Sequence, residues 1–209
     1  MKIGGLVKQS FCDWEGKLSA VVFTQGCNFR CAYCHNPSLV LPELIKTQPT
    51  IPEDDIFSFL KQRGGWLDAV VISGGEPTMQ ADLSEFIAKI KNMGFPVKLD
   101  TNGTCPEILA LLFKNNLLDF VAMDIKSVCK QEEYENVTGI SDCKVITSVL
   151  NSIALIIASG IPFQFRTTLL PDVHNEKIKK DLLSAFASYP FVFQEYREGN
   201  NLGDYLKCN

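Results

Sequence analysis

Three cysteines within an eight-residue segment are the residues of this chain best suited to chemistry. Cys27, Cys31 and Cys34 have the spacing C-x₃-C-x₂-C, directly after Gly26. Thiolates bind soft metal ions and iron–sulfur clusters. A closed zinc site needs a fourth ligand, which would have to be the adjacent His35 or a distant cysteine. A [4Fe–4S] cluster on three thiolates keeps one iron open, so the spacing favours such a cluster over zinc or over buried, inert thiols.

A pair of glycines marks a second candidate site. The sequence SGGEP (73–77) ends the next apolar run of the chain. Without a Cβ, Gly74 and Gly75 let a backbone approach a ligand closely, and Glu76 follows them. The alternative is an ordinary turn between a strand and a helix.

Charged residues stand at the ends of three further runs. Asp100 and Asp124 occur in DTNG (100–103) and MDIK (123–126). A carboxylate there is costly without a partner, so each either caps a helix, pairs with a cation such as Lys126, or acts with the other on one rim. Arg166 is either a buried ion-pair partner or a ligand for an anionic group. His174, in the loop sequence PDVHN, is expected at the surface.

The cysteine motif, with the aromatic Tyr33 before its last cysteine, resembles the signature of the radical S-adenosylmethionine (SAM) superfamily. The resemblance implies that Cys27, Cys31 and Cys34 ligate a [4Fe–4S] cluster whose open iron binds the amino and carboxylate groups of SAM. One-electron reduction then cleaves SAM to methionine and a 5′-deoxyadenosyl radical, which abstracts hydrogen from a substrate. The GGEP run (74–77) resembles the superfamily motif that receives the SAM amino group, which implies SAM binding by Gly74, Gly75 and Glu76.

The DTNG and D-x-K motifs resemble those of the glycyl-radical-enzyme activases. In those proteins two aspartates hold a monovalent cation beside the SAM carboxylate, and the histidine of a CHNP run (here 34–37) lies against SAM. Where the activases carry a histidine after their last strand, this chain has Arg197. The resemblance therefore implies these further SAM-binding residues: Tyr33, His35, Asp100, Asn102, Asp124, Lys126 and Arg166.

The first 37 residues resemble most closely the activating proteins of anaerobic (class III) ribonucleoside-triphosphate reductases. The implied activity is that of an oxidoreductase that generates a glycyl radical in the partner reductase, with a flavodoxin- or ferredoxin-type electron donor. One alternative is an activase of another glycyl radical enzyme, such as pyruvate formate-lyase. Another is a small-molecule enzyme such as 7-carboxy-7-deazaguanine synthase, although that family reads C-D-T where this chain has Cys34-His35-Asn36. A non-catalytic zinc or iron–sulfur module would leave GGEP and DTNG without a purpose.

Strands and helices that alternate along the chain must position these residues. Apolar and β-branched runs predict strands at 19–23, 69–73, 97–101, 120–125, 163–169 and 191–196. Apolar residues at helical spacing predict helices near 56–60, 83–93, 108–113, 145–157 and 178–186. This α/β pattern predicts a mainly parallel sheet in an open, partial (β/α)₆ barrel, a single domain over 1–209, with the functional residues at the carboxyl ends of the strands.

Composition argues against several other classes of protein. The 20 Lys and Arg and 24 Asp and Glu give a net charge of −4 without a long basic block, which disfavours a nucleic-acid partner. No apolar run approaches the ~18 residues of a membrane span, and the N-terminus shows no secretory signal, so we expect a cytoplasmic protein without a membrane partner. The remaining cysteines lack a C-x₂-C pairing and are expected to be ordinary thiols: Cys12, Cys105, Cys129, Cys143 and Cys208.

Overall fold

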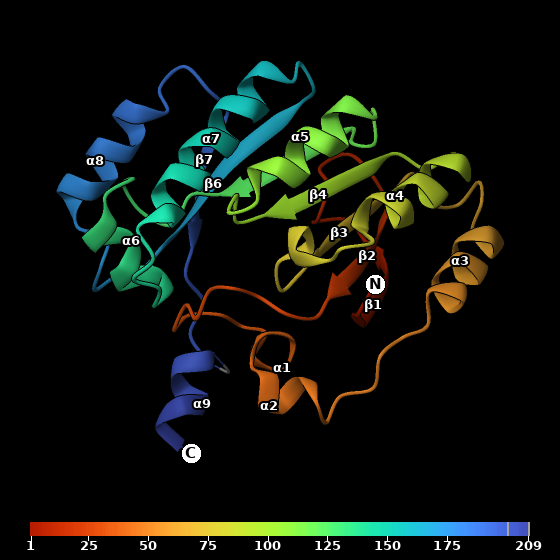
Figure 1. Ribbon diagram of the computed structural model, residues 1–209, viewed down its shortest axis with the longest axis horizontal. Helices are drawn as coiled ribbons and strands as arrows, with labels where there is room; N and C mark the ends of the chain where they lie inside the picture. The colour runs from red at the N-terminus through yellow and green to blue at the C-terminus, as the bar shows by residue number, and fades with distance from the viewer. Residues whose placement is uncertain (200, 209) are drawn as a thin grey trace.

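The computed structural model describes residues 1–199 and 201–208, without the side chains of Lys207 and Cys208 (Figure 1). The expectation for the Cys208 thiol therefore lies outside the described residues. None of the helices described there is long and apolar enough to cross a membrane.

A seven-stranded sheet runs through the described chain in the sequential order β1 to β7. Its six parallel strands match the predicted ones, and the sheet is open, so the predicted fold class is confirmed. The additional strand, β1, pairs antiparallel with β2 and was not expected. The strands are β1 (Ile3–Ser10), β2 (Ser19–Thr24), β3 (Ala69–Gly74), β4 (Val97–Thr101), β5 (Phe120–Asp124), β6 (Phe163–Leu169) and β7 (Phe191–Glu195).

Five helices cover one face of the sheet, as the apolar periodicity predicted (Figure 1). They are α3 (Glu53–Gln62), α4 (Leu83–Asn92), α5 (Pro106–Lys114), α7 (Lys144–Ala158) and α8 (Glu176–Ala185), with a 3₁₀ turn η1 (Pro77–Met79). Local sequence fixes their starts: three acidic residues occupy the first turn of α3, and the Asn175 side chain caps α8 by accepting a hydrogen bond from the Ile178 N–H.

Short helices that were not expected gather beyond the carboxyl ends of the parallel strands (Figure 1). They are α1 (Pro37–Val40), α2 (Pro42–Ile45) and α9 (Leu202–Cys208), while α6 (Gln131–Thr138) follows β5. α9 joins the cysteine loop through two backbone hydrogen bonds, from the Leu202 N–H to the Cys34 carbonyl (2.9 Å) and from the Gly203 N–H to the Ala32 carbonyl (2.7 Å). The C-terminal segment therefore lies beside the residues most able to do chemistry.

The two faces of the sheet differ in character. Alternate residues such as Val97, Leu99 and Val121 pack under the helices in the main core. The strand residues between these face the opposite, concave side of the sheet, where a smaller apolar cluster includes Trp14 and Val71. Because side chains alternate along a strand, Lys98 and Asp100 also lie on the concave side. Charged groups thus lie on the concave side of the sheet beside this apolar cluster.

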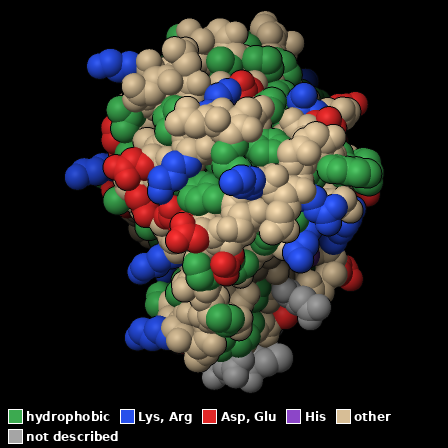
Figure 2. All heavy atoms as spheres, turned by 90° about the vertical axis from the view of Figure 1, so that its right-hand side faces the viewer, with side chains coloured by type: hydrophobic (Ala, Val, Ile, Leu, Met, Phe, Trp, Pro, Cys, Tyr) green, Lys and Arg blue, Asp and Glu red, His purple; other side chains and the backbone are tan. Residues whose placement is uncertain are grey.

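The outer surface seen in Figure 2 mixes acidic and basic side chains with apolar ones. On this face neither charge forms a broad continuous patch.

Candidate functional site

A cavity of about 660 Å³ lies at the carboxyl ends of the parallel strands, within the range of a small-molecule site. Every residue that the sequence nominated lines it: Cys27, Cys31, Tyr33, Cys34, His35, Gly74, Gly75, Glu76, Asp100, Asn102, Asp124, Lys126 and Arg166. Sequence reasoning missed further lining residues, among them Phe29, Ser73, Thr168 and Gln194. Phe29 lies inside the cysteine motif and the other three lie within predicted strands, and these positions were the only available signal.

The cluster loop, which we define as residues 26–36, carries the three cysteines. Arg30 stabilises the conformation of this loop, because its guanidinium donates hydrogen bonds of 2.7 Å to the carbonyls of both Cys27 and Phe29. The Arg30 N–H donates to the Thr138 carbonyl at the end of α6 (2.8 Å). The loop is therefore braced by its own side chain and by a segment more than 100 residues away.

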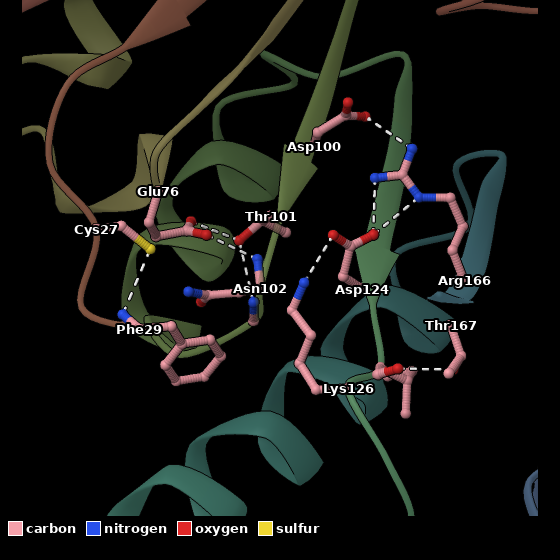
Figure 3. Close-up of polar contacts among 12 residues, drawn as sticks. Cys27, Phe29, Glu76, Asp100, Thr101, Asn102, Asp124, Lys126, Arg166 and Thr167 are labelled. Atoms are coloured by element: carbon pink, nitrogen blue, oxygen red, sulfur yellow. Dashed lines mark hydrogen bonds and ion pairs between the residues drawn. The ribbon is translucent and has the colours of Figure 1, made fainter. Parts of the chain in front are cut away.

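Burial favours the protonated thiol of two of the cysteines, Cys27 and Cys31. It raises the pKa of the Cys27 thiol to about 12 and also raises that of Cys31. The Phe29 N–H donates to the Cys27 sulfur (3.4 Å; Figure 3), which favours the thiolate. A metal or cluster that binds here must therefore displace the thiol protons.

The glycine turn after β3 is required by contact between two parts of the chain. The Gly75 N–H donates to the Thr24 carbonyl (2.9 Å), and the Glu76 N–H donates to the Gly26 carbonyl (2.7 Å). A Cβ on Gly75 would lie 2.1 Å from the Gly26 oxygen, and one on Gly74 would lie 2.3 Å from the Thr24 nitrogen. The glycines thus let this turn press against the start of the cluster loop, a reason that the sequence alone did not provide.

Glu76 is fully engaged with its own chain. Its carboxylate accepts hydrogen bonds from the Thr78 N–H (3.1 Å) and hydroxyl, from the Thr101 hydroxyl (2.7 Å) and from the Asn102 N–H (2.7 Å; Figure 3). Burial raises its pKa, although these hydrogen bonds act in the opposite direction. The Asn102 amide in turn donates to Asn28 in the cluster loop (2.9 Å). Glu76 therefore joins the exits of β3 and β4, and Asn102 joins them to the cluster loop.

Ion pairs connect five charged side chains, which we call the charge cluster: Lys98, Asp100, Asp124, Lys126 and Arg166. All of them except Lys98 line the cavity, across from Cys27 (Figure 3). The Asp124 carboxylate lies 2.8 Å from an Arg166 terminal nitrogen and 3.0 Å from the Lys126 Nζ. Burial opposes its ionisation, but these two cations outweigh burial and lower the pKa of Asp124 to about 2. The reciprocal effect raises the pKa values of Lys126 and Arg166.

Aromatic rings connect the cluster loop to the rest of the mouth. The Lys126 ammonium lies 5.7 Å from the centre of the Tyr33 ring, a cation–π contact. His35 stacks on Tyr196, with ring centres 6.1 Å apart, and the Tyr196 hydroxyl accepts a hydrogen bond from Asn201. Tyr196 was missed as a site residue, although it directly follows the last strand. Arg197, its neighbour, also lines the cavity.

His174 is buried, so the expectation that it lies at the surface was wrong. Its Nδ1 accepts a hydrogen bond from the Leu170 N–H (2.8 Å), which leaves Nε2–H to donate to the Lys126 carbonyl (2.9 Å). Burial lowers the His174 pKa and favours this neutral form. The imidazole thus ties the exit of β6 to the segment that carries Lys126.

Comparison with known proteins agrees with this arrangement. A family model described as the Radical SAM superfamily matches residues 21–185. The chain belongs to this superfamily. It is 40% identical over 185 residues to a protein of Methanocaldococcus jannaschii provisionally named a glycyl-radical enzyme activating enzyme, covering 86% of this chain and 73% of that one. It is 31% identical over 188 residues to the pyruvate formate-lyase-activating enzyme of Streptococcus mutans, covering 81% and 67%.

Solved structures share the radical SAM fold. Streptococcus suis SuiB bound to SAM superposes with a TM-score of 0.65 at 14% identity, over 90% of this chain and 48% of SuiB. The chain thus spans about half the length of that protein. At this identity the likeness concerns the fold alone.

Radical SAM membership implies a [4Fe–4S] cluster and SAM as cofactors, and the donor set fits such a cluster. Cys27, Cys31 and Cys34 are free thiols on one cavity. Among the described residues, no three His, Cys, Asp or Glu side chains converge to hold a single ion. A closed one-metal site would need such convergence, whereas a cluster takes each thiolate on a separate iron.

Proposed function

We propose that this chain is an activating enzyme that generates a glycyl radical in a partner protein, with SAM as co-substrate. The observation that carries the proposal is that Cys27, Cys31 and Cys34 share one cavity with four members of the charge cluster, which are Asp100, Asp124, Lys126 and Arg166. The cysteines provide soft ligands on one side, and the charge cluster provides two cations and two carboxylates on the other. A zwitterionic amino acid group bound at iron would meet compensating charges there.

The site residues would then divide into ligands and positioning groups. Cys27, Cys31 and Cys34 would hold the [4Fe–4S] cluster, which when loaded with SAM supplies one-electron reductive cleavage of the sulfonium. Gly74 and Gly75 line the cavity, and a backbone carbonyl there would accept the SAM ammonium.

The rings and charged groups would orient SAM. Tyr33 and His35 would hold it from the cluster loop, and Lys126 and Arg166 would attract its carboxylate. Asp100 and Asp124 would act by holding these cations. Glu76 and Asn102 are positioning residues in this scheme, because their polar atoms are engaged within the chain.

We assign the partner as the anaerobic ribonucleoside-triphosphate reductase, and the electron donor as a flavodoxin- or ferredoxin-type protein in the cytoplasm. The first 37 residues support this assignment through the resemblance described above. The partner would cover the mouth beside the cluster loop and α9, where Leu206 is 56% exposed. A protein substrate would also exclude water from the radical, which a small-molecule enzyme would achieve with its own lid.

Electron paramagnetic resonance tests the proposal. Anaerobically reconstituted protein, SAM and a reductant should give a glycyl radical doublet when mixed with the ribonucleotide reductase of the same organism. A Cys34→Ala variant should give none. A signal with another glycyl radical enzyme only, such as the pyruvate formate-lyase type suggested by the Streptococcus mutans relative, would reject the reductase and keep the activase. Deuterium transfer from a small molecule into deoxyadenosine, without a signal on any protein, would reject the activase.

A further inference from the structure

One guanidinium lies between the two carboxylates of the charge cluster. Asp124 and Arg166 are partners in the register of β5 and β6. The Arg166 Nε and one terminal nitrogen lie 2.9 and 2.8 Å from the Asp124 Oδ1. The other terminal nitrogen lies 3.6 Å from the Asp100 Oδ1 on the adjacent strand β4 (Figure 3). The planar fork of arginine therefore connects both acids.

Two lysines complete the neutralisation of these acids. The Lys98 Nζ lies 3.3 Å from the Asp100 Oδ1, and the Lys126 Nζ lies 3.0 Å from the Asp124 Oδ2. The side chains of Lys98, Lys126 and Arg166 are only 8%, 13% and 14% exposed. Lys98 also donates to the Asp13 carbonyl and does not line the cavity, so the four members that do line it carry two positive and two negative charges.

The site does not fit the monovalent cation that the activase resemblance implied. An alkali ion takes oxygen ligands, but both Asp124 oxygens are already occupied by nitrogen donors. The Asp100 Oδ1 accepts no hydrogen bond from the described residues, yet it lies between two cations, Lys98 and Arg166. A further cation would meet like charge at both Asp124 oxygens and at the Asp100 Oδ1.

We propose that Arg166 supplies the positive charge that a bound alkali ion would otherwise provide between Asp100 and Asp124, so that SAM binding by this chain needs no monovalent metal ion. This inference rests on the proposed function, in which SAM is the ligand. Asp100 and Asp124 then serve to hold a guanidinium in place at the cavity wall, where Arg166 and Lys126 face the SAM carboxylate.

Calorimetry on the anaerobically reconstituted protein tests this inference. SAM affinity is measured in N-methylglucamine chloride, sodium chloride and potassium chloride at equal ionic strength. We expect dissociation constants within twofold of one another. A tenfold or greater tightening by sodium or potassium would overturn the inference while the activase proposal stands. No SAM binding in any of the three salts would reject the proposed function, and the inference with it.

An arginine variant provides a second test. Arg166→Gln removes the charge, so we expect at least tenfold weaker SAM binding, partly restored by potassium or sodium. Arg63→Gln, at the end of α3, is the matched control and should behave as the parent in all three salts. Parent-like affinity of Arg166→Gln in N-methylglucamine chloride would overturn the inference. If Arg166→Gln fails to fold, as its melting temperature would show, the salt series on the parent protein decides alone.

Discussion

Replacing Glu76 by Gln tests whether this carboxylate acts on its own chain or on SAM. Each carboxylate oxygen accepts from a backbone N–H, one from Thr78 and the other from Asn102. A backbone N–H can only donate a hydrogen bond. In either orientation of the glutamine side chain, its NH₂ group would therefore face one of these two N–H groups instead of an acceptor. Each buried unsatisfied group costs about 1–3 kcal/mol, and loss of a buried charge offsets part of this, so we expect a net loss of ~2 kcal/mol in the free energy of unfolding.

Two further variants grade the effect. Glu76→Ala leaves both N–H groups without a partner and should cost roughly 2–6 kcal/mol. Thr101→Val removes the hydroxyl that donates to Glu76 and accepts from the Gly103 N–H (3.1 Å), so it should cost roughly 1–3 kcal/mol. Glu85→Gln, on an exposed position of α4, is the matched control and should stay within about 0.5 kcal/mol of the parent.

Urea unfolding of the apoprotein, followed by fluorescence of the buried Trp14, measures these differences. SAM affinity of the reconstituted variants is measured in parallel. If Glu76→Gln is as stable as the parent but binds SAM at least tenfold more weakly, the carboxylate acts on SAM and our reading of its contacts is refuted.

Four other predictions follow from particular contacts. Ala at any of the three cluster-loop cysteines should abolish iron retention measured by iron and sulfide analysis, whereas Cys105→Ala should retain about four irons per chain. Gly75→Ala should lower iron retention, because its Cβ would lie 2.1 Å from the Gly26 oxygen; full retention would contradict this. The pKa of His174 is lowered in the folded state, so the stability that it contributes should fall as pH drops below its unfolded pKa of about 6.5. In His174→Asn, the free energy of unfolding measured in urea should therefore depend less on pH in that range. An unchanged pH dependence would contradict this prediction. The pKa of Asp124 in the folded state is about 2, so the stability that its ion pairs contribute should be lost as pH falls from about 3.8 towards 2. Asp124→Asn should cost roughly 1–2 kcal/mol at pH 7, because the side chain is 32% exposed and its charge is partly screened. A variant as stable as the parent at pH 7 would show that the ion pairs contribute nothing.

The sequence alone determined the elements whose signal is local. Strands β2 and β3 are nearly continuous apolar or β-branched runs, β4 and β6 alternate apolar with polar residues, and the helices show 3.6-residue periodicity. Strand β1 was not predicted because Gly4 and Gly5 interrupt its apolar pattern and because Lys8 and Gln9 are polar, as is common in an edge strand. The spacing of the three cysteines is also local, and it was sufficient to indicate the cluster chemistry.

Tertiary structure decided what each polar residue contacts. The sequence left Arg166 open between an ion pair and an anion ligand, and the register of β5 and β6 placed it against Asp124. His174 lies 48 residues from the carbonyl it contacts, so no local pattern could show that it is buried. Glu76 likewise meets Asn102 only because β3 and β4 end side by side. The identity of a chemical group is encoded in the sequence, but its partners depend on which strand ends are adjacent, and that adjacency is set only when the sheet assembles.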